Sequence, residues 1–248
     1  VDGHDYIAAA AERGAAGTLC HHIPEGLPAD AAAGCVVVGD VTTALGKLAR
    51  GIIDASPGLV VIGVTGSQGK TSTKDLLAQV LSGAGPTVAP QGSFNNEIGV
   101  PLTATQVDDS TAFLVSEMGA RGQHHIEYLC SLTPPRIGIV LNVGQAHVGE
   151  FGSTDAIATA KGELVEQLPP DGWAVLNGVD DRVAAMAGRT RARVALFSGA
   201  GHPNRTADLV VWADEVTADD LDRHSLTLRV ERPGHPAAPA LRRRCPAF

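Results

Sequence analysis

A glycine-rich segment holds the residues whose types and spacing first point to chemistry. It reads Gly63-Val64-Thr65-Gly66-Ser67-Gln68-Gly69-Lys70-Thr71-Ser72. Where a strand enters such a turn and a helix leaves it, backbone N–H groups converge on one point and favour an anion such as phosphate. Lys70 adds a point charge there, and Thr71 can place its hydroxyl on a phosphate-bound Mg²⁺. Val64 replaces the first glycine of the usual P-loop pattern, so a Thr-Gly-x-x-Gly-Lys-Thr variant and a glycine-rich turn with an incidental lysine both remain open.

Lys161 carries a second chemical signature, because helical periodicity predicts that it is buried. In a helix that begins at 153–155 and turns by about 100° per residue, Lys161 falls in an apolar stripe with Ile157, Ala160, Leu164 and Leu168. Burial lowers the pKa of a lysine, and a neutral amine can add CO₂ to form a carbamate, which is an anionic oxygen ligand. A lysine that extends past its apolar neighbours to solvent is the alternative. The remaining lysines, Lys47 and Lys74, are expected on solvated helix faces.

Apolar segments that alternate with helical patterns must position these residues. Strands are expected at 35–38, 59–64, 112–116, 137–142, 174–176 and 193–197. Helices are expected at 4–13, at 42–53 and directly after the glycine turn. Continuous apolar strands separated by helices predict an α/β fold whose mainly parallel sheet is covered by helices on both faces. Alternation over 225–230 predicts antiparallel strands near the end of the chain.

The composition excludes several classes of protein. The chain has 248 residues, of which 44% are hydrophobic and 19% charged, and these values exclude disorder and coiled coil. A net charge of −8 gives no footprint for duplex DNA or anionic membranes. The longest strong apolar run, 59–64, falls far short of the roughly 18 to 20 residues that cross a bilayer. The four cysteines stand too far apart for a zinc site or a disulfide framework, so we expect a cytoplasmic setting.

Five blocks of the chain together resemble the Mur ligases. They are residues 66–75, 95–103, 117–120, 141–147 and 160–163, and the resemblance covers roughly residues 1–230. The blocks Asn-Asn-Glu-Ile-Gly-Val-Pro at 95–101 and Glu-Met-Gly-Ala at 117–120 are most similar to the family members that add D-alanyl-D-alanine. Two positions depart from the family pattern: Val179 interrupts an acidic pair, and His124 stands where a glycine is expected.

The resemblance implies formation of a peptide bond at the expense of ATP. In this family a carboxylate is phosphorylated and an amine attacks the acyl phosphate, because a carboxylate oxygen is a poor leaving group. The implied substrates are UDP-N-acetylmuramoyl-tripeptide and D-alanyl-D-alanine, which are joined in peptidoglycan precursor synthesis. ATP and two Mg²⁺ ions are the implied cofactors, since like charges must be neutralised as ATP and carboxylate approach.

The resemblance also assigns roles to individual residues. Nucleotide contacts are implied at Gly66, Ser67, Gln68, Gly69, Lys70, Thr71, Ser72, Asn142, Asn177 and Asp180. Metal ligands are implied at Thr71, Glu117, His147 and a carbamylated Lys161, and catalytic roles at Lys70, His147 and Lys161. Contacts to the muramoyl substrate are implied at Asn95 and Asn96. Taken alone, Glu117 is also compatible with a solvated loop carboxylate, His147 with a loop histidine and the asparagine pair with a simple turn.

The same resemblance divides the chain into domains. Residues 1–57 correspond to part of an N-terminal UDP-substrate domain, residues 58–232 to a central ATP-binding domain and residues 233–248 to an irregular tail, with the C-terminal domain absent. We therefore expect these residues to form a monomer that binds nucleotide and Mg²⁺ weakly without completing ligation. Two alternatives stay open: a sibling amide ligase, which adds diaminopimelate or lysine or extends folylpolyglutamate, and a non-catalytic nucleotide-binding module.

Overall fold

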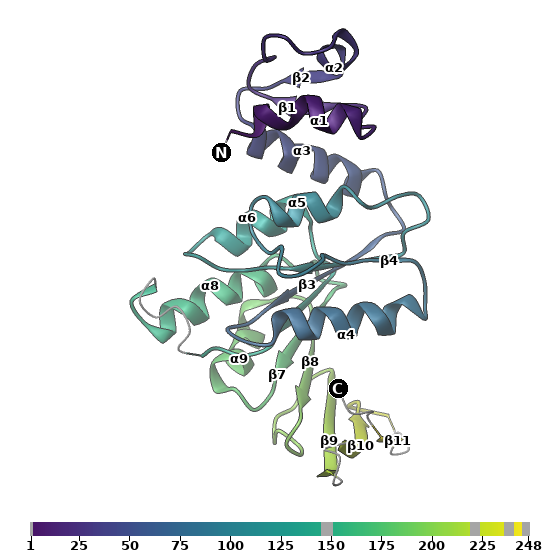
Figure 1. Ribbon diagram of the computed structural model, residues 1–248. Helices are drawn as coiled ribbons and strands as arrows, with labels where there is room; N and C mark the ends of the chain where they lie inside the picture. The colour runs from purple at the N-terminus through teal and green to yellow at the C-terminus, as the bar shows by residue number, and fades with distance from the viewer. Residues whose placement is uncertain (1, 145–150, 219–223, 236–240, 245–248) are drawn as a thin grey trace.

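The computed structural model describes residues 2–144, 151–218, 224–235 and 241–244, which form two sheets. The smaller sheet pairs β1 (Thr18–Cys20) with β2 (Cys35–Val37) in parallel. The larger sheet has nine strands in the order β11-β10-β9-β8-β7-β6-β3-β5-β4 (Figure 1). Its strands are β3 (Val60–Thr65), β4 (Thr87–Val88), β5 (Phe113–Glu117), β6 (Ile137–Val140), β7 (Trp173–Asn177), β8 (Arg193–Ser198), β9 (Leu209–Ala218), β10 (His224–Glu231) and β11 (Leu241–Arg244).

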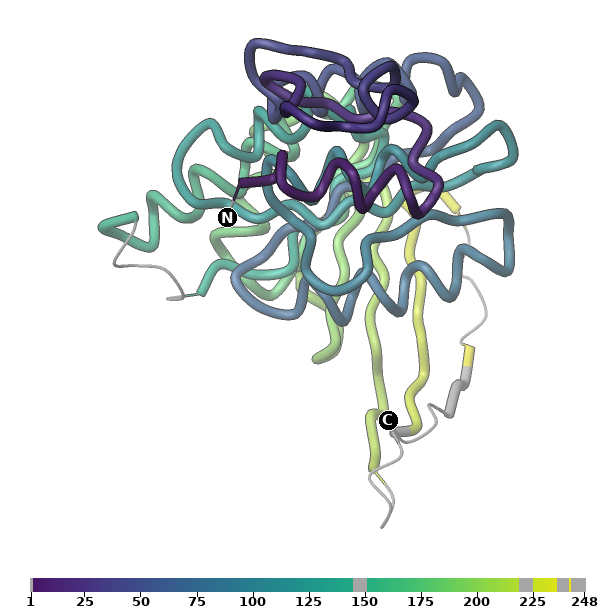
Figure 2. Tube along the Cα trace, turned by 45° about the horizontal axis from the view of Figure 1, so that its top comes forward, coloured from purple at the N-terminus to yellow at the C-terminus, as the bar shows by residue number. Residues whose placement is uncertain are grey.

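The direction of the strands changes twice across the large sheet, on either side of β10. All neighbouring pairs from β4 to β9 are parallel, whereas β10 runs antiparallel to both β9 and β11. Strands β9 and β10 extend beyond the body of the molecule (Figure 2). The predicted α/β fold with a mainly parallel sheet is confirmed, and the alternating segment at 225–230 lies in antiparallel β10 as expected.

Helices cover both faces of the parallel part, as Figure 1 shows for α4 on one side and α5 and α6 on the other. The alternating side chains of β3 divide between these layers: Ile62 and Val64 pack with residues of α4, and Val61 packs with residues of α3 and α5. Strands buried on both faces produce the continuous apolar runs seen in the sequence. The helices are η1 (Gly3–Tyr6), α1 (Ile7–Glu12), α2 (Ala29–Ala33), α3 (Val41–Asp54), α4 (Lys70–Ser82), α5 (Gly99–Ala104), α6 (His125–Leu132), α8 (Thr154–Glu166), α9 (Asp181–Ala185) and η2 (Met186–Arg189).

Two glycines let helix α8 lie close to the centre of the sheet. A Cβ at Gly63 of β3 would approach Leu164 Cδ1 to 2.8 Å, and a Cβ at Gly138 of β6 would approach Leu164 Cγ to 3.1 Å. Any side chain at Gly63 would therefore push α8 away from β3. This close packing fixes how near the other buried residues of α8 lie to the end of β3.

The first residues of the chain form a small unit around β1 and β2, at the purple end of Figure 1. Helix α3, which the predicted boundary at residue 57 assigns to this unit, also packs on the large sheet. Its Ala49 is fully buried with Val61, Ala104 and Leu114, and Arg50 donates from Nη1 to the Ser131 carbonyl at 3.1 Å. Helix α3 thus joins the small unit to the core of the large one, and the division at residue 57 stays a prediction.

The expectation of an irregular tail is wrong. The tail 233–248 was expected to be irregular, but Leu241–Arg244 forms strand β11, whose Leu241 pairs with Leu228 of β10. An edge strand is held by backbone hydrogen bonds, so its composition need not show the apolar pattern by which buried strands are recognised. Within the described part of the chain, no helix has both the length and the apolar character needed to span a membrane.

Candidate active site

The glycine turn lies between β3 and α4, at the carboxyl end of β3, which is an interior strand of the sheet. Gly69 has a φ of 79°, a left-handed conformation that glycine adopts without steric cost. A Cβ at Gly66 would come within 2.9 Å of Leu141 Cβ, so the turn also packs tightly against the loop after β6. The predicted strand, turn and helix are all present, and they aim the first backbone N–H groups of α4 at the space beyond the sheet.

The loop after β6 holds the glycine turn in place. Gln68 N–H donates to Asn142 Oδ1 at 2.9 Å, and Asn142 Nδ2 donates back to the Gln68 carbonyl at 3.2 Å. Gly144 N–H donates to Ser67 Oγ at 2.9 Å. In this structure Asn142 therefore shapes the turn, and its predicted contact with nucleotide stays a prediction.

Lys70, the first residue of α4, points back into the turn. Its ammonium donates to the Gly66 carbonyl at 2.8 Å. Partial burial lowers the pKa of Lys70, while the nearby Glu117 carboxylate acts in the opposite direction. The charge of Lys70 thus stands beside the backbone N–H groups that would face a phosphate.

At the end of β5, the Glu117 side chain contacts side chains of α4 and of the segment before α5. It is only 1% exposed, and its Cα pairs in register with Val64 just before the glycine turn. Its Oε2 accepts from Thr71 Oγ1 at 3.0 Å, and its Oε1 accepts from Asn95 Nδ2 at 2.8 Å. A buried carboxylate next to a hydroxyl offers the hard oxygen atoms that Mg²⁺ prefers, and Mg²⁺ needs only one or two such protein ligands beside phosphate and water.

Lys161 lies on α8, which Ser153 caps by accepting from Ala156 N–H at 3.1 Å. The side chain is 5% exposed, so the burial expected from helical periodicity is observed. This burial, together with the positive charge of Lys70, lowers the pKa of Lys161 to about 8. A substantial fraction of its amine is then neutral slightly above neutral pH, which is the form that reacts with CO₂.

Lys70 and Lys161 meet in one cavity of about 160 Å³. Among the described residues, the lining includes three cationic side chains, those of Lys70, Arg121 and Lys161, and no carboxylate. It also includes the predicted substrate contacts Asn95 and Asn96. A small cavity with this charge balance favours a polyanionic ligand. The described residues that line it are Gly66, Lys70, Asn95, Asn96, Gly119, Ala120, Arg121, His125 and Lys161.

Asn95 and Asn96 precede α5 in the sequence and lie beside the end of β5 in space. Asn95 accepts from Gly119 N–H at 2.9 Å through its carbonyl, and Asn96 Oδ1 accepts from Gly99 N–H at 2.8 Å at the start of α5. Both side chains line the cavity. Their backbone is thus held beside Glu117, while their predicted contact with a muramoyl group stays a prediction.

Asn177 and Asp180 form hydrogen bonds with the loop after β6 and not with the glycine turn directly. Asn177 Nδ2 donates to the Leu141 carbonyl at 2.9 Å. Asp180 caps α9 through Oδ1 and accepts from Val143 N–H at 2.9 Å through Oδ2. Their side chains thus hold the loop that in turn holds the glycine turn. Nothing in these contacts tests their predicted role in nucleotide binding, and His147, the predicted histidine ligand, lies outside the described residues.

Sequence reasoning missed several residues at or near the site. Lys74, expected on a solvated face of α4, is only 1% exposed and donates to the Pro90 carbonyl. Arg121 and His125 line the cavity, and Glu97 lies between them, 3.4 Å from each. A hydrogen bond to its own backbone, followed by the charge of Arg121 and the contact with His125, lowers the pKa of Glu97. Helical spacing could have indicated Lys74, which follows Thr71 by three residues, whereas the other contacts join distant segments.

Helix α6 begins with an arrangement that explains an unexpected residue. His124 stands where a glycine was expected and has a φ of 64°, the left-handed conformation that glycine would supply. The buried Glu163 of α8 accepts from His124 N–H at 2.6 Å and from Glu127 N–H at 3.1 Å. Glu163 therefore caps α6 from a distance and connects it to the helix that carries Lys161.

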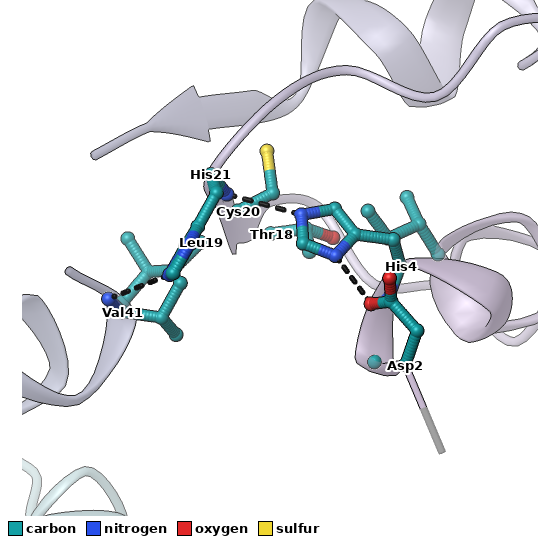
Figure 3. Close-up of a pocket in the computed structure, with 9 residues that line it drawn as sticks. Asp2, His4, Thr18, Leu19, Cys20, His21 and Val41 are labelled. Carbon is teal, nitrogen blue, oxygen red and sulfur yellow. Dashed lines mark hydrogen bonds and ion pairs between the residues drawn. The ribbon is translucent and has the colours of Figure 1, made fainter. Parts of the chain in front are cut away.

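A second cavity, of about 350 Å³, lies in the small N-terminal unit (Figure 3). His4 Nδ1 is 2.6 Å from Asp2 Oδ1, and His4 Nε2 accepts from His21 N–H at 3.1 Å. His21 Nε2 accepts in turn from Val41 N–H at 3.4 Å. These bonds connect η1, β1 and α3. Among the described residues, no three His, Cys, Asp or Glu side chains are grouped as metal ligands.

Known proteins have similar sequences and a similar architecture. The ligase named UDP-N-acetylmuramoyl-tripeptide–D-alanyl-D-alanine ligase in Mycobacterium bovis is 46% identical over 244 residues, which cover 92% of this chain and 46% of that protein. The enzyme of the same name in Escherichia coli is 39% identical over 176 residues, which cover 71% of this chain and 38% of that protein. The chain thus spans about half the length of the Mycobacterium bovis relative.

Solved structures agree with these relatives. A crystal structure of MurF from Acinetobacter baumannii matches 98% of this chain and 50% of its own, with a TM-score of 0.78 and 29% identity. MurF from Thermotoga maritima in complex with ADP matches 98% of this chain and 52% of its own, with a TM-score of 0.74 and 25% identity. A family model described as the Mur ligase middle domain matches residues 64–235, which hold the glycine turn, Glu117 and Lys161. This match covers most of the chain, and the chain therefore belongs to the Mur ligase family.

Proposed function

We propose that this chain contains the nucleotide-binding site of a ligase that joins D-alanyl-D-alanine to UDP-N-acetylmuramoyl-tripeptide and converts ATP to ADP. The observation that carries the proposal is the cationic cavity in which Lys70 and Lys161 lie beside Asn95 and Asn96, with Glu117 directly behind it. The names of the relatives supply the substrates, and the ADP-bound Thermotoga maritima structure supports the nucleotide.

Each residue of the site has a separate role that follows from its position. The glycine turn and Lys70 bind and orient the triphosphate, whose negative charge would otherwise repel the incoming carboxylate. The carboxylate attacks the γ-phosphorus, and ADP leaves as an acyl phosphate forms. The amine of the dipeptide then attacks the acyl carbon, phosphate leaves with the C–O bonding pair, and the amine loses a proton. Arg121, which lines the same cavity, stabilises the negative charge that accumulates there.

Thr71 and Glu117 would hold Mg²⁺, which neutralises phosphate charge when it is bound. The donor set fits this ion, because both groups offer oxygen and already lie within 3.0 Å of each other. His147 is proposed as a ligand of a second ion on the family resemblance alone. Asn95 and Asn96, which line the same cavity, are proposed to contact the muramoyl substrate.

Lys161 is proposed to carry a carbamate. The buried side chain and a pKa of about 8 favour the neutral amine that adds CO₂. The product is an anion next to the positive Lys70, so Coulomb attraction would stabilise it there. We expect a ¹³C NMR carbamate signal with ¹³CO₂ in the wild-type protein and in K47M, and none in K161M. CO₂-depleted buffer should weaken the response of activity to Mg²⁺, and an unchanged response would contradict the carbamate.

The enzymatic proposal is tested with the protein in the full length that its gene encodes. ADP formation should require both UDP-N-acetylmuramoyl-tripeptide and D-alanyl-D-alanine. Replacement of the dipeptide by lysine, diaminopimelate or glutamate should abolish it, and turnover with one of these instead would favour a sibling ligase. Binding of ADP without turnover under any substrate pair would favour a non-catalytic nucleotide module.

The 248 residues by themselves are proposed to bind nucleotide without completing ligation, since they correspond to only about half of the relatives' length. Calorimetry with Mg²⁺ and ADP should detect binding to this chain. Turnover by this chain alone would contradict the proposal.

A further inference from the structure

Lys74 is a buried cation that the proposed chemistry does not use. It lies on α4, its side chain is 1% exposed, and it is among the largest fully buried side chains of the described part of the chain. Its ammonium donates to the Pro90 carbonyl at 2.7 Å and contacts Asp75 Oδ1 at 2.5 Å. Because burying an ammonium is costly unless it is well hydrogen-bonded, a lysine at this depth calls for a physical reason.

The position of Lys74 on α4 connects it to the active site. Lys74 follows Lys70 by four residues and Thr71 by three, so the three side chains share one face of the helix. Thr71 uses this face to donate to Glu117, and Lys74 uses it to donate to Pro90. Helix α4 therefore holds both Glu117 and the start of the segment 90–96 from a single rigid surface.

The segment 90–96 is held by contacts at both of its ends, and at the second end Asn96 Oδ1 also accepts from Gly99 N–H, while Phe94 packs closely against Gly99. The segment contains no helix or strand, and residues 91–94 between its two ends are exposed. At the first end, the buried Pro90 accepts from Lys74. At the second end, Asn95 donates to Glu117 Oε1, and its carbonyl accepts from Gly119 N–H. A Cβ at Gly119 would come within 2.9 Å of Asn95 Oδ1, so this end already fits closely against β5 and the residues that follow it.

We propose that Lys74 is a positioning residue that fixes the segment 90–96 so that Asn95 and Asn96 face the cavity. The inference rests on the proposed function, because it assigns to Lys74 control over binding of the muramoyl substrate. Lys74 sets the start of the segment, and Glu117 and Gly119 set its end. The phosphate site is held separately by the loop after β6, through Asn142 and Ser67. Lys74 therefore affects binding of the muramoyl substrate and not binding of the nucleotide.

A methionine at position 74 would test this role, because it fills a similar volume but cannot donate a hydrogen bond. The Pro90 carbonyl would then be buried without a partner, and the segment would move to reach water or another donor. Lys47 of α3 provides the matched control, since it is exposed and does not line the cavity. K47M removes the same charge from a solvated helix surface.

The experiment compares wild type, K74M and K47M in the full-length protein. In K74M we expect the KM for UDP-N-acetylmuramoyl-tripeptide to rise at least tenfold, and the Kd for ADP with Mg²⁺ to change less than twofold. Hydrogen exchange measured by mass spectrometry should become faster in peptides that cover 91–98 and stay unchanged in peptides that cover 173–185. K47M should match wild type in all three measurements.

Two results would overturn the proposal: an unchanged KM in K74M, or a loss of ADP affinity as large as the loss of substrate affinity. If K74M does not fold, K74R takes its place, because it keeps a cationic donor but displaces it. A KM at least threefold above wild type with unchanged ADP affinity then supports the proposal, and an unchanged KM overturns it. If wild type itself shows no ADP formation that depends on D-alanyl-D-alanine, the proposed function fails. Faster exchange at 91–98 in K74M would then still show that Lys74 holds the segment.

Discussion

Replacing Lys161 by Met should make the folded protein more stable at neutral pH. The side chain is 5% exposed and lies beside Lys70, so folding removes its ammonium from water and places it near another cation. Its pKa falls from 10.5 to about 8. At about 1.36 kcal/mol for each pKa unit, this corresponds to a cost of about 3 kcal/mol for keeping the charged form folded. Met has a similar volume and carries no charge, so K161M avoids that cost.

The difference in stability between K161M and wild type should depend on pH in a defined direction. The pKa of Lys161 is lower in the folded than in the unfolded state, so between pH 8 and 10.5 the unfolded chain binds more protons. The free energy of unfolding of wild type therefore rises with pH in this window, relative to that of K161M. The advantage of K161M should be constant below about pH 8 and should disappear near pH 10.5. Other titrating groups are shared by the two proteins and cancel in the difference.

Urea denaturation followed by circular dichroism measures this difference at pH 7, 8, 9 and 10. CO₂-free buffer keeps the Lys161 amine unmodified, and K47M controls for loss of a lysine at an exposed helix position. Two results would refute the conclusion that burial lowers the pKa of the Lys161 amine. One is a stability advantage of K161M that does not change with pH, and the other is a K161M protein that is less stable than wild type at pH 7. The reasoning for a carbamate at this position would then lose its physical basis.

Three further perturbations test other parts of the site. E117Q removes the charge that is proposed to hold Mg²⁺, so calorimetry should show ADP binding that no longer strengthens when Mg²⁺ replaces EDTA; an undiminished Mg²⁺ effect would show that Glu117 is not a ligand. H124G should raise the free energy of unfolding by about 1 kcal/mol, because glycine adopts the left-handed backbone of this position without strain; urea denaturation measures it, and a loss of stability would contradict the strain. E163Q should cost about 1–3 kcal/mol, because an amide cannot accept from both His124 and Glu127 N–H groups through two charged oxygens. The matched E166Q, on the exposed side of the same helix, should cost less than about 1 kcal/mol in the same measurement.

Local pattern was enough to predict much of the fold and the centre of the site. The apolar run at 59–64 and the glycines that follow it predict the strand and turn observed as β3 and the start of α4. The burial of Lys161 also followed from the sequence, because a helix places residues four apart on one face wherever it packs. Short elements such as β1 and β4 were missed, since two or three residues carry too little periodicity to be recognised.

What the sequence by itself determined was the order of strand, turn and helix, the α/β class and the resemblance that named Lys70, Thr71 and Glu117 together. The tertiary structure alone decided which distant groups meet: Lys74 with the Pro90 carbonyl, and Glu163 with the start of α6. It likewise gave the tail its strand β11. The physical reason is that propensity and periodicity act over a few neighbouring residues. A hydrogen bond between segments depends instead on where packing brings a backbone N–H or carbonyl, and every residue except proline carries both of these groups.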